Sequence, residues 1–372
     1  MLDLDIEQFW DDDDKAHEDG CFGKEAPQVA LGIRMSEECV FAELGEEGNP
    51  WGEIPRERRM ELNKRYNEKA RKIVGRDLLP EYIAPATDNF PAFRRIGEVF
   101  DGEYLFDGNS EWLKGNCDTP AALEKLLDKI DEMDFRSFIL PINWESEKKR
   151  LFEKCGKKPA QFAGVRGPVT LATSIYGVEN LIFLIYDYPD LAKRFSDTIA
   201  KVLIDYIELF IEESGQTQDN FRHGFGFADD NCCLLTADMY EFFGLPILQK
   251  VFAKTSPLPG DSRYQHSDSA MGHLLPLLAQ TGLTGCNFGP TVMISEIRKY
   301  MKNATIDGAL APFTFMNNDE SQIIAEVKRD CEMARVDDIR GVNLTTAGSI
   351  NNGSLLTSMR TVMAAIQKYG RY

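Results

Sequence analysis

The stretch RYQHSDSAMGHLLPLLAQTGLTGCNFG, residues 263–289, predicts a strand, a helix and a second strand in succession. Two short candidate strands, the largely polar 262–268 and the more apolar 283–289, carry polar residues near their ends, and a leucine-rich helical segment lies between them. A strand that leads through a helix into another strand is the repeating unit of α/β proteins with a parallel sheet. The polar residues that close these runs, His266 among them, are therefore expected at one edge of such a sheet.

Units of the same kind recur along most of the chain. Further strands are predicted at 136–143, 161–167, 222–230, 303–310 and 340–346, and amphipathic helical stretches follow most of them. Such repetition favours a (β/α)8 barrel over a doubly wound sheet, partly because no G-x-G-x-x-G turn opens a helix after the first strands. The predicted fold class is α/β, a (β/α)8 TIM barrel with an N-terminal extension.

The N-terminal part of the chain differs from the rest. It begins acidic and irregular, with an apolar segment PQVALGI and a strand candidate, CVFAEL, at 39–44. A helix is then predicted over 54–75, because Pro55 suits a first helical turn and a glycine stands at its end. We expect residues 1–76 to form an extension and helix that cap the barrel, and residues 77–372 to form the catalytic domain.

Composition excludes several classes of function. The formal net charge is −18, from 60 acidic against 42 basic residues, which opposes binding to nucleic acid and to anionic membranes. No apolar run is long enough to span a membrane, and the first residues lack the pattern of a secretory signal. The eight cysteines are too sparse for a disulfide scaffold and contain no CxxC pair, so we expect free thiols and a cytoplasmic protein.

In a barrel of this type the active site lies at the carboxyl ends of the strands. The side chains that close the predicted strands are mostly polar or titratable, and they include Asn143, Arg166, Asp229, Asp230, His266, Asp268, Cys286, Asn287, Asp307 and Asn343. Carboxylates, an imidazole and a thiol at one edge suit acid/base catalysis or metal binding. The alternatives are structural, because aspartate after a strand is often a helix N-cap and cysteine is often a buried apolar residue.

Of the four histidines, only His266 is placed for chemistry by the sequence pattern. His273 falls within the following helix, His223 opens its strand, and His17 lies in the N-terminal extension. Cys286 ends the strand after the one that bears His266, which makes it the better ligand candidate among the cysteines.

Several segments together resemble the uroporphyrinogen decarboxylase superfamily. They are the run from GPVTLATSIYGVEN to FIEESG, then FADDNCCLLTADMYEFFGLPILQKVF, HSDSAMGHLLPLLAQTGLTGCNFGP and the closing GSLLTSMRTVMAAIQKYGRY. The resemblance covers residues 77–372 and implies a (β/α)8 barrel. The family includes porphyrinogen decarboxylases and methyltransferases that exchange methyl groups with a corrinoid protein.

The chain departs from two patterns of this family. Its segment PAFRRIGEVF does not reproduce the arginine-rich MRQAGR-like segment of true decarboxylases, which makes a decarboxylase or another lyase the alternative reading. Thiol-directed methyltransferases bind zinc through His-x-Cys and a later Cys, whereas here Asp268 follows His266 and Ala347 stands near the later position. A thiol acceptor is therefore a poor fit, and a non-catalytic binding barrel is the second alternative.

The resemblance implies a corrinoid-dependent methyltransferase of the O-demethylase type, of use in anaerobic metabolism. A small methyl donor, most plausibly a phenyl methyl ether, would pass its methyl group to cobalamin on a separate corrinoid protein, since the chain has no Asp-x-His-x-x-Gly cobalamin signature. The predicted roles are catalytic for His266, Asp229 and Asp230; substrate-binding for Asn143, Arg166, Asp268, Asp307 and Asn343; and zinc-binding for His266, Cys286 and Asp230. The family is compatible with a homodimer.

Overall fold

A computed structural model describes residues 2–106 and 110–372 of the chain. The chain divides into two compact units. The first consists of Met1–Ile83, Gln265–Leu275 and Leu283–Tyr372, and the second of Ala84–Tyr264 and Pro276–Gly282. Both units are therefore discontinuous in sequence, and the chain passes from one to the other within the strand that carries His266.

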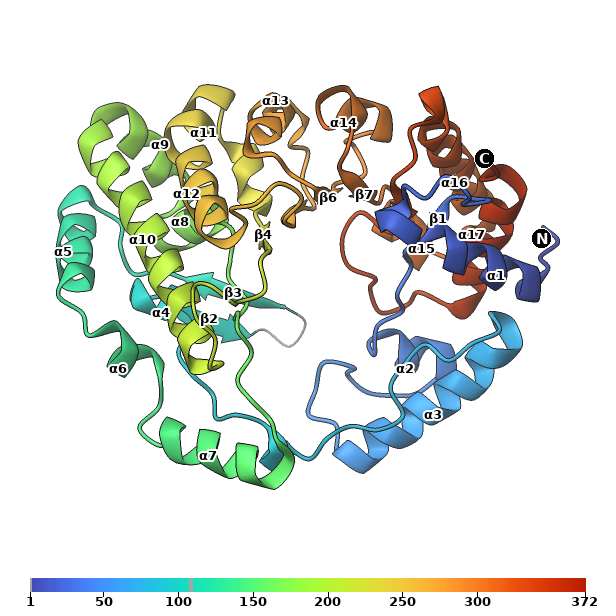
Figure 1. The fold of residues 1–372 in the computed structure, drawn as a ribbon, viewed down its shortest axis with the longest axis horizontal. Helices are drawn as coiled ribbons and strands as arrows, with labels where there is room; N and C mark the ends of the chain where they lie inside the picture. The colour runs from blue at the N-terminus through green and yellow to red at the C-terminus, as the bar shows by residue number, and fades with distance from the viewer. Residues whose placement is uncertain (1, 107–109) are drawn as a thin grey trace. The chain divides into compact units, whose positions relative to one another are not determined.

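The first unit is built on parallel strands (Figure 1). They are β1 (Ala30–Leu31), β5 (Arg263–Ser267, from Gln265 onward in this unit), β6 (Gly285–Phe288), β7 (Thr305–Asp307) and β8 (Val342–Leu344). Their order is β1-β8-β7-β6-β5, with β1 parallel to β8, β8 to β7 and β7 to β6. Strands that follow each other in the chain are neighbours in space, and the first lies beside the last, which is the connectivity of a barrel.

Helices cover the apolar face of these strands. The first unit contains α1 (Ile6–Ala16), α2 (Cys39–Leu44), α3 (Arg56–Ile73), α14 (Ile294–Tyr300), α15 (Pro312–Met316), α16 (Glu320–Ala334) and α17 (Leu356–Tyr369). Helix α16 begins where the Asp319 side chain accepts hydrogen bonds from the backbone of Ser321 and Gln322, and it packs against α17. The short helix α13 (Leu275–Leu278) begins at the last residue of a first-unit segment.

The second unit is mainly helical. It contains α4 (Ile96–Val99), the hairpin β2 (Glu103–Phe106) and β3 (Glu111–Lys114), α5 (Pro120–Asp131), α6 (Phe135–Ile139), α7 (Trp144–Cys155), α8 (Pro168–Tyr176), α9 (Val178–Asp187), α10 (Pro189–Glu213), β4 (Phe225–Ala228), α11 (Ala237–Phe243) and α12 (Leu245–Thr255). Helix α10 has 25 residues and a broad buried face, and it contacts α4, α5, α8, α9, α11 and α12 (Figure 1). Strand β4 pairs with β5, beginning with Phe225 N donating to Ser262 O.

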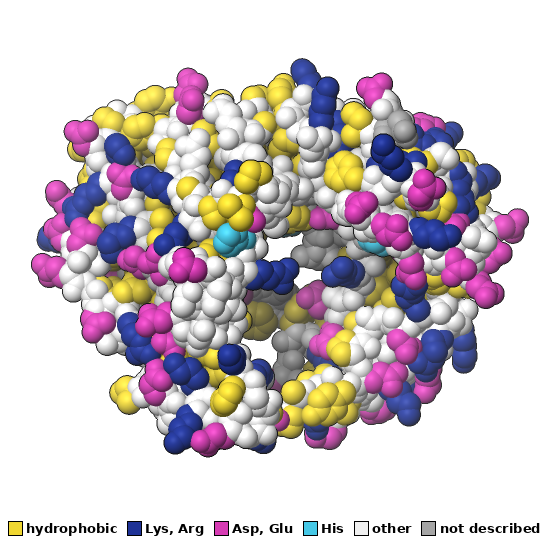
Figure 2. Space-filling model, viewed as in Figure 1, with side chains coloured by type: hydrophobic (Ala, Val, Ile, Leu, Met, Phe, Trp, Pro, Cys, Tyr) yellow, Lys and Arg dark blue, Asp and Glu magenta, His cyan; other side chains and the backbone are white. Residues whose placement is uncertain are grey.

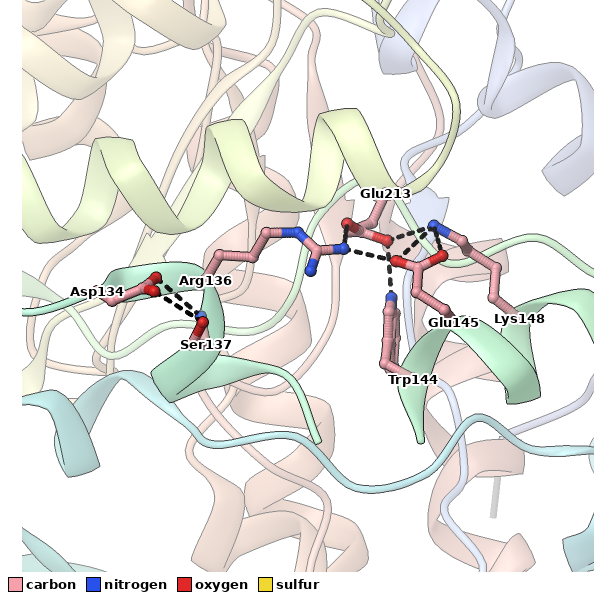
Figure 3. A network of polar contacts seen from close by, with 7 residues as sticks. All are labelled: Asp134, Arg136, Ser137, Trp144, Glu145, Lys148 and Glu213. Carbon is pink, nitrogen blue, oxygen red and sulfur yellow. Dashed lines mark hydrogen bonds and ion pairs between the residues drawn. The ribbon is translucent and has the colours of Figure 1, made fainter. Parts of the chain in front are cut away.

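A buried carboxylate fixes the end of α10 to α6 and α7 (Figure 3). Glu213 accepts hydrogen bonds from Arg136 (2.6 Å), the Trp144 indole (2.7 Å) and Lys148 (2.6 Å). Burial acts to raise the pKa of Glu213, but the three donors outweigh burial and hold the pKa below its ordinary value. The carboxylate is thus kept charged inside the second unit.

The α/β fold class predicted from the sequence is confirmed, with six strands in the larger sheet of the described residues. The strands predicted at 222–230, 262–268, 283–289, 303–310 and 340–346 each contain an observed strand. The predicted helix at 54–75 is also present, as α3.

Three predicted strands are wrong. Residues 136–143 contain most of helix α6, which starts because Asp134 accepts hydrogen bonds from the backbone and hydroxyl of Ser137. The segment at 39–44 is helix α2, ended by Gly45 with φ of 65°. Residues 161–167 are not a strand, although Gly167 N donates to Ala228 O of β4.

The predicted N-terminal extension contributes a strand to the sheet. Its segment PQVALGI contains β1, whose residues Ala30 and Leu31 pair with Asn343 and Leu344 of β8. A strand of two residues is too short to produce a recognisable alternating pattern, so the sequence did not reveal it.

Acidic and basic side chains are interspersed over the face seen in Figure 2. Within the described residues no single helix has the length and apolar composition to cross a membrane; α8 and α9 reach that level only as a pair, bent by 98°.

Candidate active site

Three polar side chains lie in register on adjacent strands of the first unit. Asn287 of β6 pairs with Asp307 of β7, and Asp307 pairs with Asn343 of β8. Residues opposite each other on parallel neighbours point to the same face of the sheet, and the next residue along each strand points to the other face. The other face carries Cys286, Ile306 and Val342, which are all buried. We call Asn287, Asp307, Asn343 and the adjoining His266 the polar row.

Asn287 determines which nitrogen of His266 bears the proton. The Asn287 Nδ2 donates to two backbone carbonyls, Asp307 O at 2.7 Å and Thr346 O at 3.1 Å. These acceptors fix the orientation of the amide, so that Asn287 Oδ1 faces His266 Nδ1 at 2.8 Å and must accept from it. The neutral ring is therefore the Nδ1–H tautomer, and Nε2 is left for chemistry.

The Nε2 atom of His266 faces a carboxylate. Asp268 Oδ1 lies 3.0 Å from it, and the His266 side chain is 28% exposed, so the pair is accessible to small molecules. When the ring is protonated, both nitrogens donate, one to Asn287 and one to Asp268. A ring held between two acceptors can carry a proton and release it from Nε2.

The loop after β8 leaves room for this carboxylate. Gly348 has φ of 115°, and a Cβ at this position would lie 2.5 Å from Asp268 Oδ1. The Thr346 hydroxyl, two residues earlier in the chain, donates a hydrogen bond to Gly348 O. A residue with a side chain at position 348 would therefore displace Asp268 as well as strain the backbone.

Asn343 offers an acceptor at the other end of the polar row. Its Nδ2 donates to Asp307 Oδ1 at 2.7 Å, whereas its Oδ1 is buried and has no hydrogen-bond partner among the described residues. Gly32 stands beside it, and a Cβ there would lie 2.7 Å from Asn343 Oδ1. Buried acceptors without a partner are costly, so this oxygen is suited to a hydroxyl or amine of a bound molecule.

Cys286 does not share this face. Its side chain is fully buried, and burial raises the pKa of its thiol to about 12. Metal-binding and nucleophilic cysteines act as thiolates, which require the opposite shift. The structure therefore argues against Cys286 as a zinc ligand, because it is a packed core residue beside Asn287.

Asp229, predicted to be catalytic, caps a helix of the second unit. It is completely buried, and its carboxylate accepts hydrogen bonds from Val169 N (3.3 Å) and Thr170 N (2.7 Å) at the start of α8. Burial raises its pKa to about 6, although these backbone donors act to lower it. The side chain is thus used to begin α8, a contact between residues 60 positions apart.

The other predicted residues of the second unit are Asp230, Arg166 and Asn143. Asp230 is half-buried and begins the short 3-10 helix Asp230–Leu234. Arg166 is half-buried, with its guanidinium 5.9 Å from the centre of the Tyr104 ring. Asn143 is exposed at the N-cap of α7, and the strand that was expected to place it at a barrel edge is absent.

The structure thus brings together four predicted residues, His266, Asp268, Asp307 and Asn343. Asn287, which the sequence placed at a strand end but to which no role was assigned, joins the two pairs through its amide. Its signal was available: it ends the strand after the one that bears His266, and the alternation of side chains along a strand allows only one of Cys286 and Asn287 to face the site.

Comparison with known proteins places this arrangement in a family. Residues 118–369 match the family described as uroporphyrinogen decarboxylase (URO-D). The fold is similar to that of a methyltransferase from Methanosarcina mazei, with 17% sequence identity, a TM-score of 0.55, and coverage of 92% of this chain and 94% of that chain. No curated protein sequence matches this chain significantly.

Proposed function

This chain belongs to the uroporphyrinogen decarboxylase (URO-D) family, and we propose that it is a methyltransferase that demethylates a small methyl ether. The methyl group would pass to the cobalt of a corrinoid carried by a separate protein. The observation that carries this proposal is the arrangement of His266, whose Nδ1 is held by Asn287 and whose Nε2 is accessible beside Asp268.

The chemistry requires a proton at one atom. A reduced corrinoid supplies the nucleophile that accepts the methyl carbon. The bond from carbon to the ether oxygen breaks, and its electron pair stays on that oxygen. Protonated His266 donates from Nε2 to the oxygen, so the leaving group departs as a neutral alcohol or phenol and the imidazole is left neutral. Asp268 orients the ring and stabilises its charged form before the transfer.

The substrate would be held by the remainder of the polar row. Asn343 Nδ2 donates to Asp307 Oδ1, which fixes the orientation of the amide, and Asn343 Oδ1 lacks a donor among the described residues. A hydroxyl on the methyl donor fits this acceptor. Asn143, Arg166, Asp229 and Asp230 stay predictions from the sequence.

Two arginines argue against a porphyrinogen substrate. In the segment PAFRRIGEVF, the Arg94 guanidinium lies 4.2 Å from the centre of the Phe138 ring. The Arg95 guanidinium lies 3.2 Å from the centre of the Tyr104 ring and forms an ion pair with Glu111 at 2.6 Å. Both side chains are engaged by the protein itself, which supports methyl transfer over decarboxylation of a compound with several carboxylates.

Zinc is the alternative to a proton at His266. Catalytic zinc sites use three protein ligands and leave one position open. Within the described part of the first unit, His266 and Asp268 supply two ligands, Cys286 is packed on the opposite face, and Asp230 belongs to the second unit. The first unit by itself supplies two of the three ligands that such a site needs, so metal analysis in the test below decides between zinc and the proposed His266 proton.

The proposal is tested with the purified chain, reduced cobalamin in place of the partner protein, and a panel of aryl methyl ethers. Wild type should form methylcobalamin, and His266→Gln should lower the rate by about 10²–10⁴, the usual contribution of a general acid. His273→Gln is the matched control, because His273 is exposed in the same segment. Absence of methylcobalamin with every ether would contradict the proposal, and stoichiometric zinc lost in His266→Gln would replace the proton donor by a metal.

A further inference from the structure

A cavity lies within the second unit, and none of the polar-row residues lines it. It has a volume of about 690 Å³ and is lined by the hairpin of β2 and β3, by the end of α8, and by Asn180 and Asn231. Cavities of roughly 300–1,000 Å³ are typical of small-molecule sites.

The hairpin presents an unpacked aromatic wall to this cavity. Tyr104 pairs with Leu113, and Leu105 pairs with Trp112, so the two pairs point to opposite faces of the hairpin. Leu113 is buried against Gly97, whereas Trp112 is 57% exposed. Trp112 and its neighbour Leu105 thus offer apolar surface on the face that lines the cavity, and an indole is a large flat surface on which a ring can stack.

The hairpin is held firmly against α8. Gly115 N donates to Ser174 O at 2.9 Å, and a Cβ on Gly115 would lie 2.0 Å from Ile175 O. Only glycine permits this approach. The wall that carries Trp112 is therefore fixed relative to Tyr176, which lines the same cavity.

Two asparagine side chains offer carboxamide oxygens to the cavity as hydrogen-bond acceptors. Asn231 Nδ2 donates to the Thr173 hydroxyl at 2.8 Å, and that hydroxyl donates onward to Val169 O. Asn180 Nδ2 donates to Tyr176 O at 2.8 Å. Both amides are thereby oriented, and the Oδ1 atoms of Asn231 and Asn180 receive no donor from the described residues. These two oxygens select a ligand that donates a hydrogen bond.

The cavity is also suited to a neutral ligand. Lys114 and Asp118 are both exposed at it and oppose each other in charge. The carbonyls at the end of α8 are already occupied, since Ser174 O accepts from Gly115 and Tyr176 O accepts from Asn180. Gly177 at the start of α9 also lines the cavity, but Lys114 and Asp118 leave the lining without net side-chain charge, so it does not demand an ion.

We propose that this cavity binds a small neutral aromatic compound with a hydroxyl group, a phenol. The ring lies on Trp112, and the hydroxyl donates to the carboxamide oxygen of Asn231 or Asn180. The site stands independently of the proposed methyl transfer, because its residues form no part of the polar row and binding needs no corrinoid.

The test is a ¹⁹F NMR titration of the full chain with 4-fluorophenol and with 4-fluoroanisole, which has the same ring but no hydroxyl donor. Wild type should bind 4-fluorophenol about 3- to 10-fold more tightly, the value of one hydrogen bond. Trp112→Ala should weaken both ligands at least fivefold, and Trp51→Ala, a tryptophan of the other unit, should weaken neither.

Two further variants separate recognition from folding. Asn231→Leu and Asn180→Leu are each checked by thermal unfolding, and at least one should reduce the preference for 4-fluorophenol to near unity while 4-fluoroanisole still binds. Equal affinity of the two ligands for wild type would overturn the proposal. Unchanged binding in Trp112→Ala would overturn it as well.

Discussion

Replacing the buried Asp229 by asparagine should change how stability depends on pH. The pKa of Asp229 rises from 3.8 to about 6 because burial disfavours its charge, which corresponds to about 3 kcal/mol at 1.36 kcal/mol per pKa unit. The native state then binds more protons than the unfolded state between pH 4 and 6, so this group makes stability fall as pH rises through that window. Below pH 4 the contribution vanishes.

Asparagine retains one of the two contacts at the start of α8. Its Oδ1 can accept from Thr170 N, and the longer bond from Val169 N is lost at a cost of about 1 kcal/mol. The variant should be slightly less stable than wild type at pH 4. At pH 8 it should be more stable by about 2 kcal/mol, because it carries no buried charge.

Urea unfolding followed by fluorescence from pH 4 to 8 measures this difference. The matched control is Asp319→Asn at the N-cap of α16, where the hydroxyl of Ser321 lowers the pKa of an exposed carboxylate. That variant should lose more stability at neutral pH than in acid, the opposite sign. The reasoning would be refuted if the difference in free energy of unfolding between wild type and Asp229→Asn did not change with pH. It would also be refuted if wild type became more stable relative to the variant as pH rises.

Three other predictions concern separate parts of the molecule. Glu213→Gln should lower the free energy of unfolding by about 1–3 kcal/mol, because two cations and an indole are left with a weaker acceptor. The exposed Glu145→Gln should cost less than about 1 kcal/mol, and urea unfolding compares the two variants. Gly348→Ala should abolish methyl transfer in a variant that still folds, since the added Cβ would meet Asp268 Oδ1. Methyl transfer retained in this variant would count against the site. His17→Gln should be destabilising at pH 6 and progressively less so toward pH 10. The hydrogen bond to the buried Asp13 carboxylate raises the pKa of His17 from 6.5 to about 10, so the stability gained from the protonated ring is lost above that pH. A pH-independent effect in urea unfolding would contradict this.

Strands β6, β7 and β8 of the first unit were predictable because they lie in apolar runs closed by polar residues. The segments at 283–289 and 340–346 were correctly predicted as strands for that reason. The run at 136–143 misled because its apolar residues suit a helix equally well once Asp134 caps it. Local capping thus outweighed strand propensity where no neighbouring strand offered a partner.

The candidate site was predictable in part. Position at a strand end identified His266 and Asp307, but it could not show that Asn287 joins them, because that contact depends on which face each strand presents. The contact between Asp229 and α8 could not be predicted for a related reason. The partners of Asp229 lie in α8, far away in the sequence, so its use as a helix cap was invisible before the fold was known.

The proton donated by His266 is tested most directly by varying the leaving group. A series of methyl phenyl ethers with leaving phenols of increasing acidity is assayed for methylcobalamin formation with wild type and with His266→Gln. The account predicts a weak dependence of the wild-type rate on phenol acidity and a steep one in the variant, so that the most acidic phenols nearly restore its activity. The same slope for both proteins would contradict the assignment of His266 as the general acid.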